Sequence, residues 1–174
     1  AFYRRGSAYR MKGAFDLAIQ DFGNALAIDP KYTPAYMGRG GAYGSKKDYD
    51  RSVEDYDKAI TITPGIANAY IGRGSAYVGK GQHDLALQDY GRAIGLNPNN
   101  EIAYRSRGDV YHSKGDFDSA ITDYNVAIAL RPYRSGTYIS RGNSYNSKGE
   151  YGRAIQDYDK AITINPKDAT IYYN

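Results

Sequence analysis

The sequence contains no cysteine and no tryptophan. Without cysteine there is no disulfide framework, no thiolate metal site and no cysteine nucleophile. No stretch comes near the roughly 18 apolar residues of a membrane span, so we expect a soluble protein with no membrane partner. The 23 basic and 19 acidic residues give a formal charge of +4, which hardly argues for nucleic acid. No compartment is indicated, and the cytoplasm is the default expectation.

Tyrosine is abundant instead, with 20 copies among 174 residues, and a repeat explains the excess. Five of the six prolines are spaced by 34 residues: Pro30, Pro64, Pro98, Pro132 and Pro166. The same interval separates five glycines: Gly6, Gly40, Gly74, Gly108 and Gly142. Aromatic residues and alanines hold further positions at this interval. So many registers in step over five periods indicate a tandem array.

Each repeat reads as two helices. In the third repeat, a helix predicted over residues 68–80 places Tyr70, Gly74 and Tyr77 on one face. A second helix is predicted over residues 84–96, with its own apolar face. Glycine usually follows the first helix and proline the second, and both residues end helices. The outward edge of such a hairpin can be covered only by the next repeat, which is the physical basis of a solenoid.

The first helix ends near a glycine in four of the five repeats: Gly13, Gly81, Gly115 and Gly149. Lys47 takes this place in the second repeat. Acidic residues then stand where the second helix begins, and there they favour its N-terminus: Asp48, Asp116 and Glu150.

These positions resemble the tetratricopeptide repeat (TPR) family, whose pattern of aromatic, glycine, alanine and proline residues also has a period of 34. In the third repeat the pattern falls on Tyr70, Gly74, Tyr77, Ala86, Tyr90 and Pro98. The resemblance covers essentially the whole chain. It implies an all-α fold, a right-handed superhelical α-solenoid of antiparallel helix pairs.

We interpret residues 1–174 as a single TPR array. Its repeats are a partial first one at 1–32, then 33–66, 67–100, 101–134 and 135–168, and the start of a truncated sixth at 169–174. Neither end shows the polar outer face that usually covers a terminal repeat. We therefore expect a piece of a longer array, with self-association through the uncapped terminal helices.

The leucine that the family usually has before its glycine is arginine in every repeat, and a second register holds aspartate. Helical geometry puts the two on the same side of a hairpin at nearly the same height. We therefore predict a partly buried, bidentate ion pair within each repeat. The pairs are Arg5 with Asp21, Arg39 with Asp55, Arg73 with Asp89, Arg107 with Asp123, and Arg141 with Asp157. The alternative is that these charges bind a charged ligand.

The sequence offers little for catalysis. His83 takes a position that is aromatic in other repeats, and His112 has no second histidine or paired base within one helical turn. Closely spaced aspartates lack the glycine and terminal glutamate of a calcium loop. No nucleophile, base and orienting group can be assembled. We predict a non-catalytic protein without cofactor or metal.

The resemblance implies that the first helices line a concave groove, which would bind a peptide or a helix of a partner protein. The candidate groove residues are Tyr3, Ser7, Arg10, Met37, Asn68, Ile71, Ser75, Arg105, Asp109, His112, Ile139, Asn143 and Asn146. The alternative for any one of them is a solvated surface position. Family members that clamp a C-terminal carboxylate use a lysine with an asparagine one turn later, and this clamp is absent.

Two other functions stay open. Related helical hairpins bind RNA, but the candidate groove carries only Arg10 and Arg105 as basic residues, so we expect no nucleic-acid partner. The chain could also be a purely structural or self-associating spacer within a larger protein. The sequence favours a protein-interaction scaffold.

Overall fold

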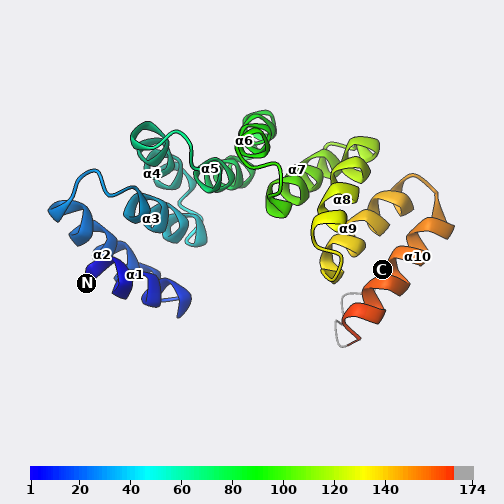
Figure 1. The fold of residues 1–174 in the computed structure, drawn as a ribbon, viewed down its shortest axis with the longest axis horizontal. Helices are drawn as coiled ribbons and strands as arrows, with labels where there is room; N and C mark the ends of the chain where they lie inside the picture. The colour runs from blue at the N-terminus through cyan, green and yellow to red at the C-terminus, as the bar shows by residue number, and fades with distance from the viewer. Residues whose placement is uncertain (167–174) are drawn as a thin grey trace. The chain divides into compact units, whose positions relative to one another are not determined.

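The computed structural model describes residues 1–166, which form ten α-helices and no β-strand (Figure 1). The chain divides into two compact units, Ala1–Leu96 (unit 1) and Asn97–Asn174 (unit 2). The predicted start of a sixth repeat, residues 169–174, lies outside the described residues. No helix within residues 1–166 has the length and apolar character needed to cross a membrane.

Every described repeat is a helical hairpin. Unit 1 contains α1 (Phe2–Met11) with α2 (Phe15–Ile28), α3 (Thr33–Ser45) with α4 (Tyr49–Ile62), and α5 (Ala67–Gly79) with α6 (His83–Leu96). Unit 2 contains α7 (Glu101–Ser113) with α8 (Phe117–Leu130), and α9 (Ser135–Ser147) with α10 (Tyr151–Ile164). In the third repeat each helix begins one residue earlier than predicted. The predicted all-α architecture of helix pairs is confirmed.

The turn inside each hairpin requires a left-handed backbone. The glycines at this position have φ values of 73–79° in four repeats, and Lys47 adopts φ 61° in the second. The next helix is then capped in two repeats by an aspartate carboxylate. Asp48 accepts from the backbone N–H of Arg51, and Asp116 from that of Ser119. Glu150 instead pairs with neighbouring basic side chains and makes no such cap.

A ring from the second helix fills the interior of each hairpin. In the third repeat a Cβ atom on Gly74 would lie 2.9 Å from the ring of Tyr90, so only glycine leaves room for this ring. Ala86, one turn earlier on α6, is fully buried. Small residues thus let the two helices approach closely and allow the tyrosine to lie between them.

Neighbouring hairpins within a unit complete each other's core. In unit 1, α2 packs on α3 and α4 on α5, while the first helices α1, α3 and α5 are adjacent (Figure 1). One buried cluster crosses the first boundary, joining Phe22 and Leu26 of α2 to Ala35 and Ala42 of α3. In unit 2, α8 packs on α9 and α7 lies next to α9. The apolar edge of a hairpin is therefore covered by the following repeat.

Ion pairs also join successive repeats within each unit. The lysine that ends one first helix binds an aspartate in the first turn of the preceding second helix. These pairs are Lys46 with Asp16, Lys80 with Asp50, and Lys148 with Asp118. The aspartates are 80–83% exposed, so each pair contributes little to stability and mainly fixes the register between repeats.

Candidate functional site

One arginine–aspartate pair connects the two helices of every repeat. In each pair the arginine Nε and Nη2 atoms donate to the two carboxylate oxygens over 2.6–2.8 Å. The pairs are Arg5–Asp21, Arg39–Asp55, Arg73–Asp89, Arg107–Asp123 and Arg141–Asp157. Hydrogen bonding to aspartate raises the pKa of these arginines. The guanidinium groups are thus held within their own repeats.

Two of these arginines also reach the preceding repeat. Arg73 donates through Nη1 to Asp57 over 2.6 Å, and Arg141 donates in the same way to Asn125. The arginine register therefore connects three helices in these two places and leaves few donors for a ligand.

In unit 2, three candidate groove residues are bound to other side chains. The carboxylate of Asp109 accepts a 2.8 Å hydrogen bond from Tyr124 and lies 3.3 Å from Nη1 of Arg105. His112 Nδ1 shares a 2.8 Å hydrogen bond with the buried hydroxyl of Ser144. The carboxylate of Asp109 and Nδ1 of His112 are therefore engaged within the chain, whereas the buried Nε of Arg105 makes no hydrogen bond among the described residues.

The remaining candidates of unit 2 lie on α9. Asn143 accepts a 2.7 Å hydrogen bond through its side-chain oxygen from the hydroxyl of Tyr158. Ile139 is half-buried and packs against the cluster that contains Tyr138. Asn146, near the end of the helix, is exposed.

In unit 1, three candidates take part in internal packing or bonding. The ring of Tyr3 lies 5.8 Å from that of Phe22, within the first hydrophobic cluster. The hydroxyl of Ser7 donates to the carbonyl of Tyr3 over 2.9 Å. Met37 packs against the cluster that contains Tyr56. These three residues are therefore engaged in packing or bonding within the repeats.

The other candidates of unit 1 lie on the surface of α1 and α5. Asn68 is exposed in the first turn of α5, and Ile71 is half-buried one turn later. Ser75 is exposed, and its hydroxyl bonds to the carbonyl of Ile71 over 2.9 Å. Arg10 is exposed near the end of α1. Of this group, Ser75 lines a cavity.

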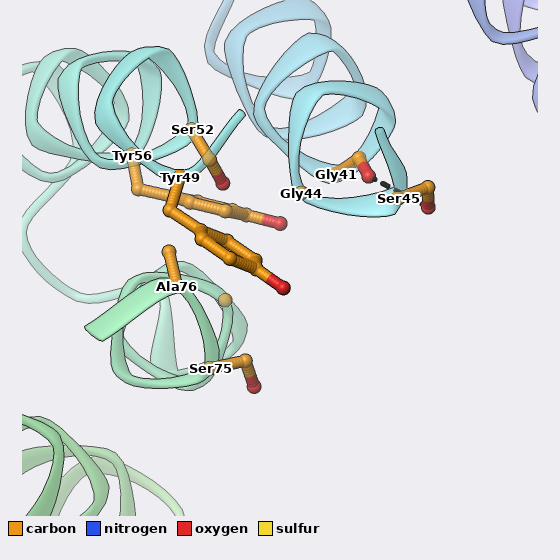
Figure 2. A pocket seen from close by; sticks show the side chains of 9 residues that line it. Gly41, Gly44, Ser45, Tyr49, Ser52, Tyr56, Ser75 and Ala76 are labelled. Carbon is orange, nitrogen blue, oxygen red and sulfur yellow. Dashed lines mark hydrogen bonds between the residues drawn. The ribbon is translucent and has the colours of Figure 1, made fainter. Parts of the chain in front are cut away.

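This cavity, of about 320 Å³, opens between α3, α4 and α5 of unit 1 (Figure 2). It is lined by Gly41, Gly44, Ser45, Tyr49, Ser52, Tyr56, Gly72, Ser75 and Ala76. Figure 2 shows Tyr49 and Tyr56 extending from α4 into the space between α3 and α5, with their hydroxyl groups toward the opening. The volume is at the lower end of the range for ligand pockets, roughly 300–1,000 Å³.

Small residues create this cavity. Gly41 and Gly44 expose the backbone of α3 to the cavity, and Ser45 is the α3 side chain among its lining residues. A Cβ atom on Gly72 would lie only 2.1 Å from Cζ of Tyr56, so this glycine lets the ring lie across α5. Ser52 donates to the carbonyl of Gly40 over 2.8 Å, which ties the floor of the cavity to α3.

The cavity wall is mainly apolar, with several hydroxyl groups and no charged side chain among its lining residues. Tyr56 is 9% exposed, and burial raises the pKa of its hydroxyl while the nearby charge of Arg10 acts in the opposite direction. The hydroxyl is consequently protonated at neutral pH and is available as a hydrogen-bond donor. Ser45 and Ser75 contribute further hydroxyl groups at the rim.

Sequence reasoning missed the part of this site that comes from a second helix. It placed the groove on first helices only, whereas Tyr49, Ser52 and Tyr56 of α4 form the floor. One signal was present, because Ser52 stands where the repeat pattern expects alanine. A second signal was the pair of glycines Gly41 and Gly44 on α3, which leave space beside the second helix.

The described residues contain no assembly typical of catalysis by a metal. No group of three or more histidine, aspartate or glutamate side chains within residues 1–166 could hold a metal ion. The histidine with a defined partner, His112, bonds to a buried serine, and its ring lies 5.3 Å from that of Phe117. Its role in the structure is packing between α7, α8 and α9.

Hairpins with shared cores and a 34-residue period define an α-helical repeat protein. Models of the tetratricopeptide repeat match residues 1–32, 33–66 and 103–134, and a TPR repeat model matches residues 74–115 and 142–174. The chain belongs to the tetratricopeptide repeat family. Members of this family are generally non-catalytic. The family and the similar solved structures favour a protein-interaction scaffold. No curated protein sequence matches the chain significantly.

Several solved structures are similar over nearly the whole chain. MamA is 31% identical with a TM-score of 0.82, over 95% of this chain and 96% of its own. TTC0263, a thermophilic TPR protein of Thermus thermophilus, is 25% identical with a TM-score of 0.82, over 98% and 93%. YrrB, described as a TPR protein with an unusual peptide-binding site, is 23% identical with a TM-score of 0.76, over 99% and 89%. The last likeness bears on the fold alone.

Proposed function

We propose that this chain is a non-catalytic scaffold that binds a peptide segment of a partner protein on the first-helix surface of unit 1, formed by α1, α3 and α5. The cavity between α3, α4 and α5 carries the proposal and would receive one or two side chains of the peptide. The remainder of the peptide would lie along the exposed parts of the three helices.

The shape and chemistry of the cavity support a peptide ligand. Its α3 wall exposes backbone at Gly41 and Gly44, which allows the close approach of another main chain. Its serine hydroxyls can donate to and accept from peptide groups. Pockets of this kind select side chains, while main-chain contacts along the surface contribute affinity. YrrB, whose described peptide-binding site belongs to that protein, provides a precedent within the same fold.

The surface of unit 2 is less suited to this role. There the polar first-helix residues bond internally, as Asp109 does to Tyr124 and Asn143 to Tyr158. A ligand would have to replace these hydrogen bonds before it gained any of its own, and an unpaired buried group costs about 1–3 kcal/mol.

The test is panning of the immobilised chain against a random dodecapeptide library, with affinities of recovered peptides measured by fluorescence anisotropy. In one variant, Gly44→Val, a side chain enters the cavity. The register tolerates valine, because Val78 occupies the same place in the third repeat. We expect recovered peptides to bind this variant at least roughly tenfold more weakly, a loss of about 1.4 kcal/mol.

The matched control is Gly95→Thr, on α6, where nothing lies within 4 Å of an added Cβ and where other repeats carry threonine. It should bind like the wild type. Equal affinity of the wild type and Gly44→Val would contradict the cavity as the site. Failure to recover any peptide, together with concentration-dependent growth in mass by light scattering, would favour the self-associating spacer instead.

A further inference from the structure

One position of the first helix faces a tyrosine hydroxyl of the second helix in successive repeats. In the fourth repeat Asp109 accepts from Tyr124 over 2.8 Å, and in the fifth Asn143 accepts from Tyr158 over 2.7 Å. In the third repeat the hydroxyl groups of Ser75 and Tyr90 lie 3.2 Å apart. Each of these three repeats thus supplies a partner for its own tyrosine. The first repeat has phenylalanine in place of this tyrosine and needs no partner.

The second repeat breaks this pattern. Its tyrosine is Tyr56, and the facing position is Gly41, which has no side chain to offer. Within residues 1–166 no hydrogen bond is made by the Tyr56 hydroxyl, although the residue is only 9% exposed. Figure 2 shows this hydroxyl directed into the cavity beside Gly41. The ring of Tyr56 is thus buried, while its hydroxyl donor is open to the cavity at the place where the neighbouring repeats have an acceptor.

A cation borders the same place. An added Cβ on Gly41 would lie 3.4 Å from the Tyr56 hydroxyl and 3.9 Å from Nη1 of Arg10, and no other side chain or remote backbone lies within 4 Å of it. In the part of the chain that the structure describes, Arg10 forms no ion pair. A neutral donor and a positive charge converge on one small volume, which favours an anionic acceptor over a neutral one.

We propose that the Tyr56 hydroxyl and the Arg10 guanidinium form a subsite for an acidic side chain, the aspartate or glutamate of a bound peptide. The ligand carboxylate takes the place that the carboxylate of Asp109 holds in the fourth repeat, where arginine also accompanies the tyrosine. This inference rests on the proposed function and adds the chemistry of the residue recognised.

The chain itself contains the model for this interaction. In the fourth repeat the same carboxylate meets Tyr124 on one side and Arg105 on the other, at 2.8 and 3.3 Å. Tyr56 occupies the same place in its hairpin as Tyr124, whereas the guanidinium of Arg10 comes from α1 of the preceding repeat rather than from the helix that carries Arg105. A carboxylate near Gly41 would lie within reach of both the Tyr56 hydroxyl and the Arg10 guanidinium. The difference is that the carboxylate must come from another molecule.

The experiment uses a position-scanning hexapeptide library, with each residue type fixed in turn at each position, and measures binding to the full chain. The wild type should favour aspartate or glutamate at one position by about tenfold or more, as expected for a charge-assisted hydrogen bond. Tyr56→Phe keeps the ring, removes the donor and should abolish this preference. Arg10→Gln should weaken it and narrow the gap between aspartate and asparagine.

A second pair of variants tests whether a side chain of the protein itself can replace the ligand carboxylate as the acceptor for the Tyr56 hydroxyl. Gly41→Asn reproduces the residue of the fifth repeat, so its side chain should occupy Tyr56 and eliminate the acidic preference. Gly95→Asn introduces the same residue at an exposed position of α6, where nothing lies within 4 Å, and should leave the preference unchanged.

The outcomes separate the two proposals. Peptides that bind without an acidic preference, or that keep it in both Tyr56→Phe and Gly41→Asn, overturn the subsite while the peptide-binding function stands. A wild type that retains no library peptide overturns the proposed function and the subsite with it.

Discussion

The arginine–aspartate pairs give a stability prediction whose size follows from burial. Arg107→Met removes both donors from Asp123, whose side chain is only 5% exposed. Breaking one partner of a buried pair costs about 3–5 kcal/mol. Because the Arg107 side chain is 24% exposed and water can partly replace it, we expect the lower end, about 3 kcal/mol.

The assay is urea unfolding at pH 7, followed by circular dichroism at 222 nm. With a dependence of roughly 2 kcal/mol per molar urea, a loss of about 3 kcal/mol lowers the midpoint by about 1 to 2 M. The double variant Arg107→Met/Asp123→Leu replaces the pair by apolar side chains of similar size. It should regain most of the loss, because no buried charge is left without a partner.

The control is Arg5→Met, which removes the guanidinium of the first repeat, on α1. Arg5 is 59% exposed, so water can reach Asp21 when it is removed, and the loss should be clearly smaller than for Arg107→Met. Equal losses in the two single variants, or a double variant as unstable as Arg107→Met, would refute the reasoning from the buried charge.

Three further predictions concern stability and are checked by chemical or thermal unfolding. Gly72→Ala forces a methyl group to 2.1 Å from the Tyr56 ring and should cost about 1–3 kcal/mol, whereas Gly95→Ala, in open space, should gain up to about 1 kcal/mol; similar effects would contradict the tight contact. Tyr124→Phe removes a donor to a carboxylate and should cost about 1–2 kcal/mol, whereas Tyr56→Phe should change stability by less than about 0.5 kcal/mol; equal losses would show that Tyr56 already has a partner. Hydrogen bonds from arginine hold the pKa of Asp21 below its usual 3.8, so the unfolded chain binds more protons near that pH. Melting temperatures should therefore be steady above about pH 5 and fall as the pH drops through the folded-state pKa. A melting temperature that rises on acidification would contradict the lowered pKa of Asp21 in the folded chain.

Most of the fold could be predicted from the periodicity of the sequence. The 34-residue interval located every hairpin, and the glycine and lysine at the turns have the left-handed backbone that such turns need. These features depend on local sequence, which is why the sequence alone identifies them. The TPR family and the all-α fold are confirmed. The ends of helices shifted by a residue because capping depends on backbone geometry that periodicity does not determine.

The candidate site was harder to predict because periodicity assigns a residue to a face but not to a partner. Asp109 and Asn143 belong to the first-helix surface, yet each is bound to a tyrosine of its own repeat. Tyr56 belongs to a buried register, yet its hydroxyl reaches the cavity. The informative position was Gly41, which has no side chain. Its significance depends on the Tyr56 hydroxyl that faces it, and the sequence alone does not show that these two residues are neighbours.

The tyrosine-facing position has a consequence for how such a chain can change. In the subsite that we propose, the residue at this position determines whether the tyrosine hydroxyl is bound within its own repeat or is available to another molecule. Mutation can therefore move a recognition point from one repeat to another, or duplicate it, without altering the scaffold beneath. On this proposal, specificity would depend on which repeat lacks the side chain that binds its own tyrosine.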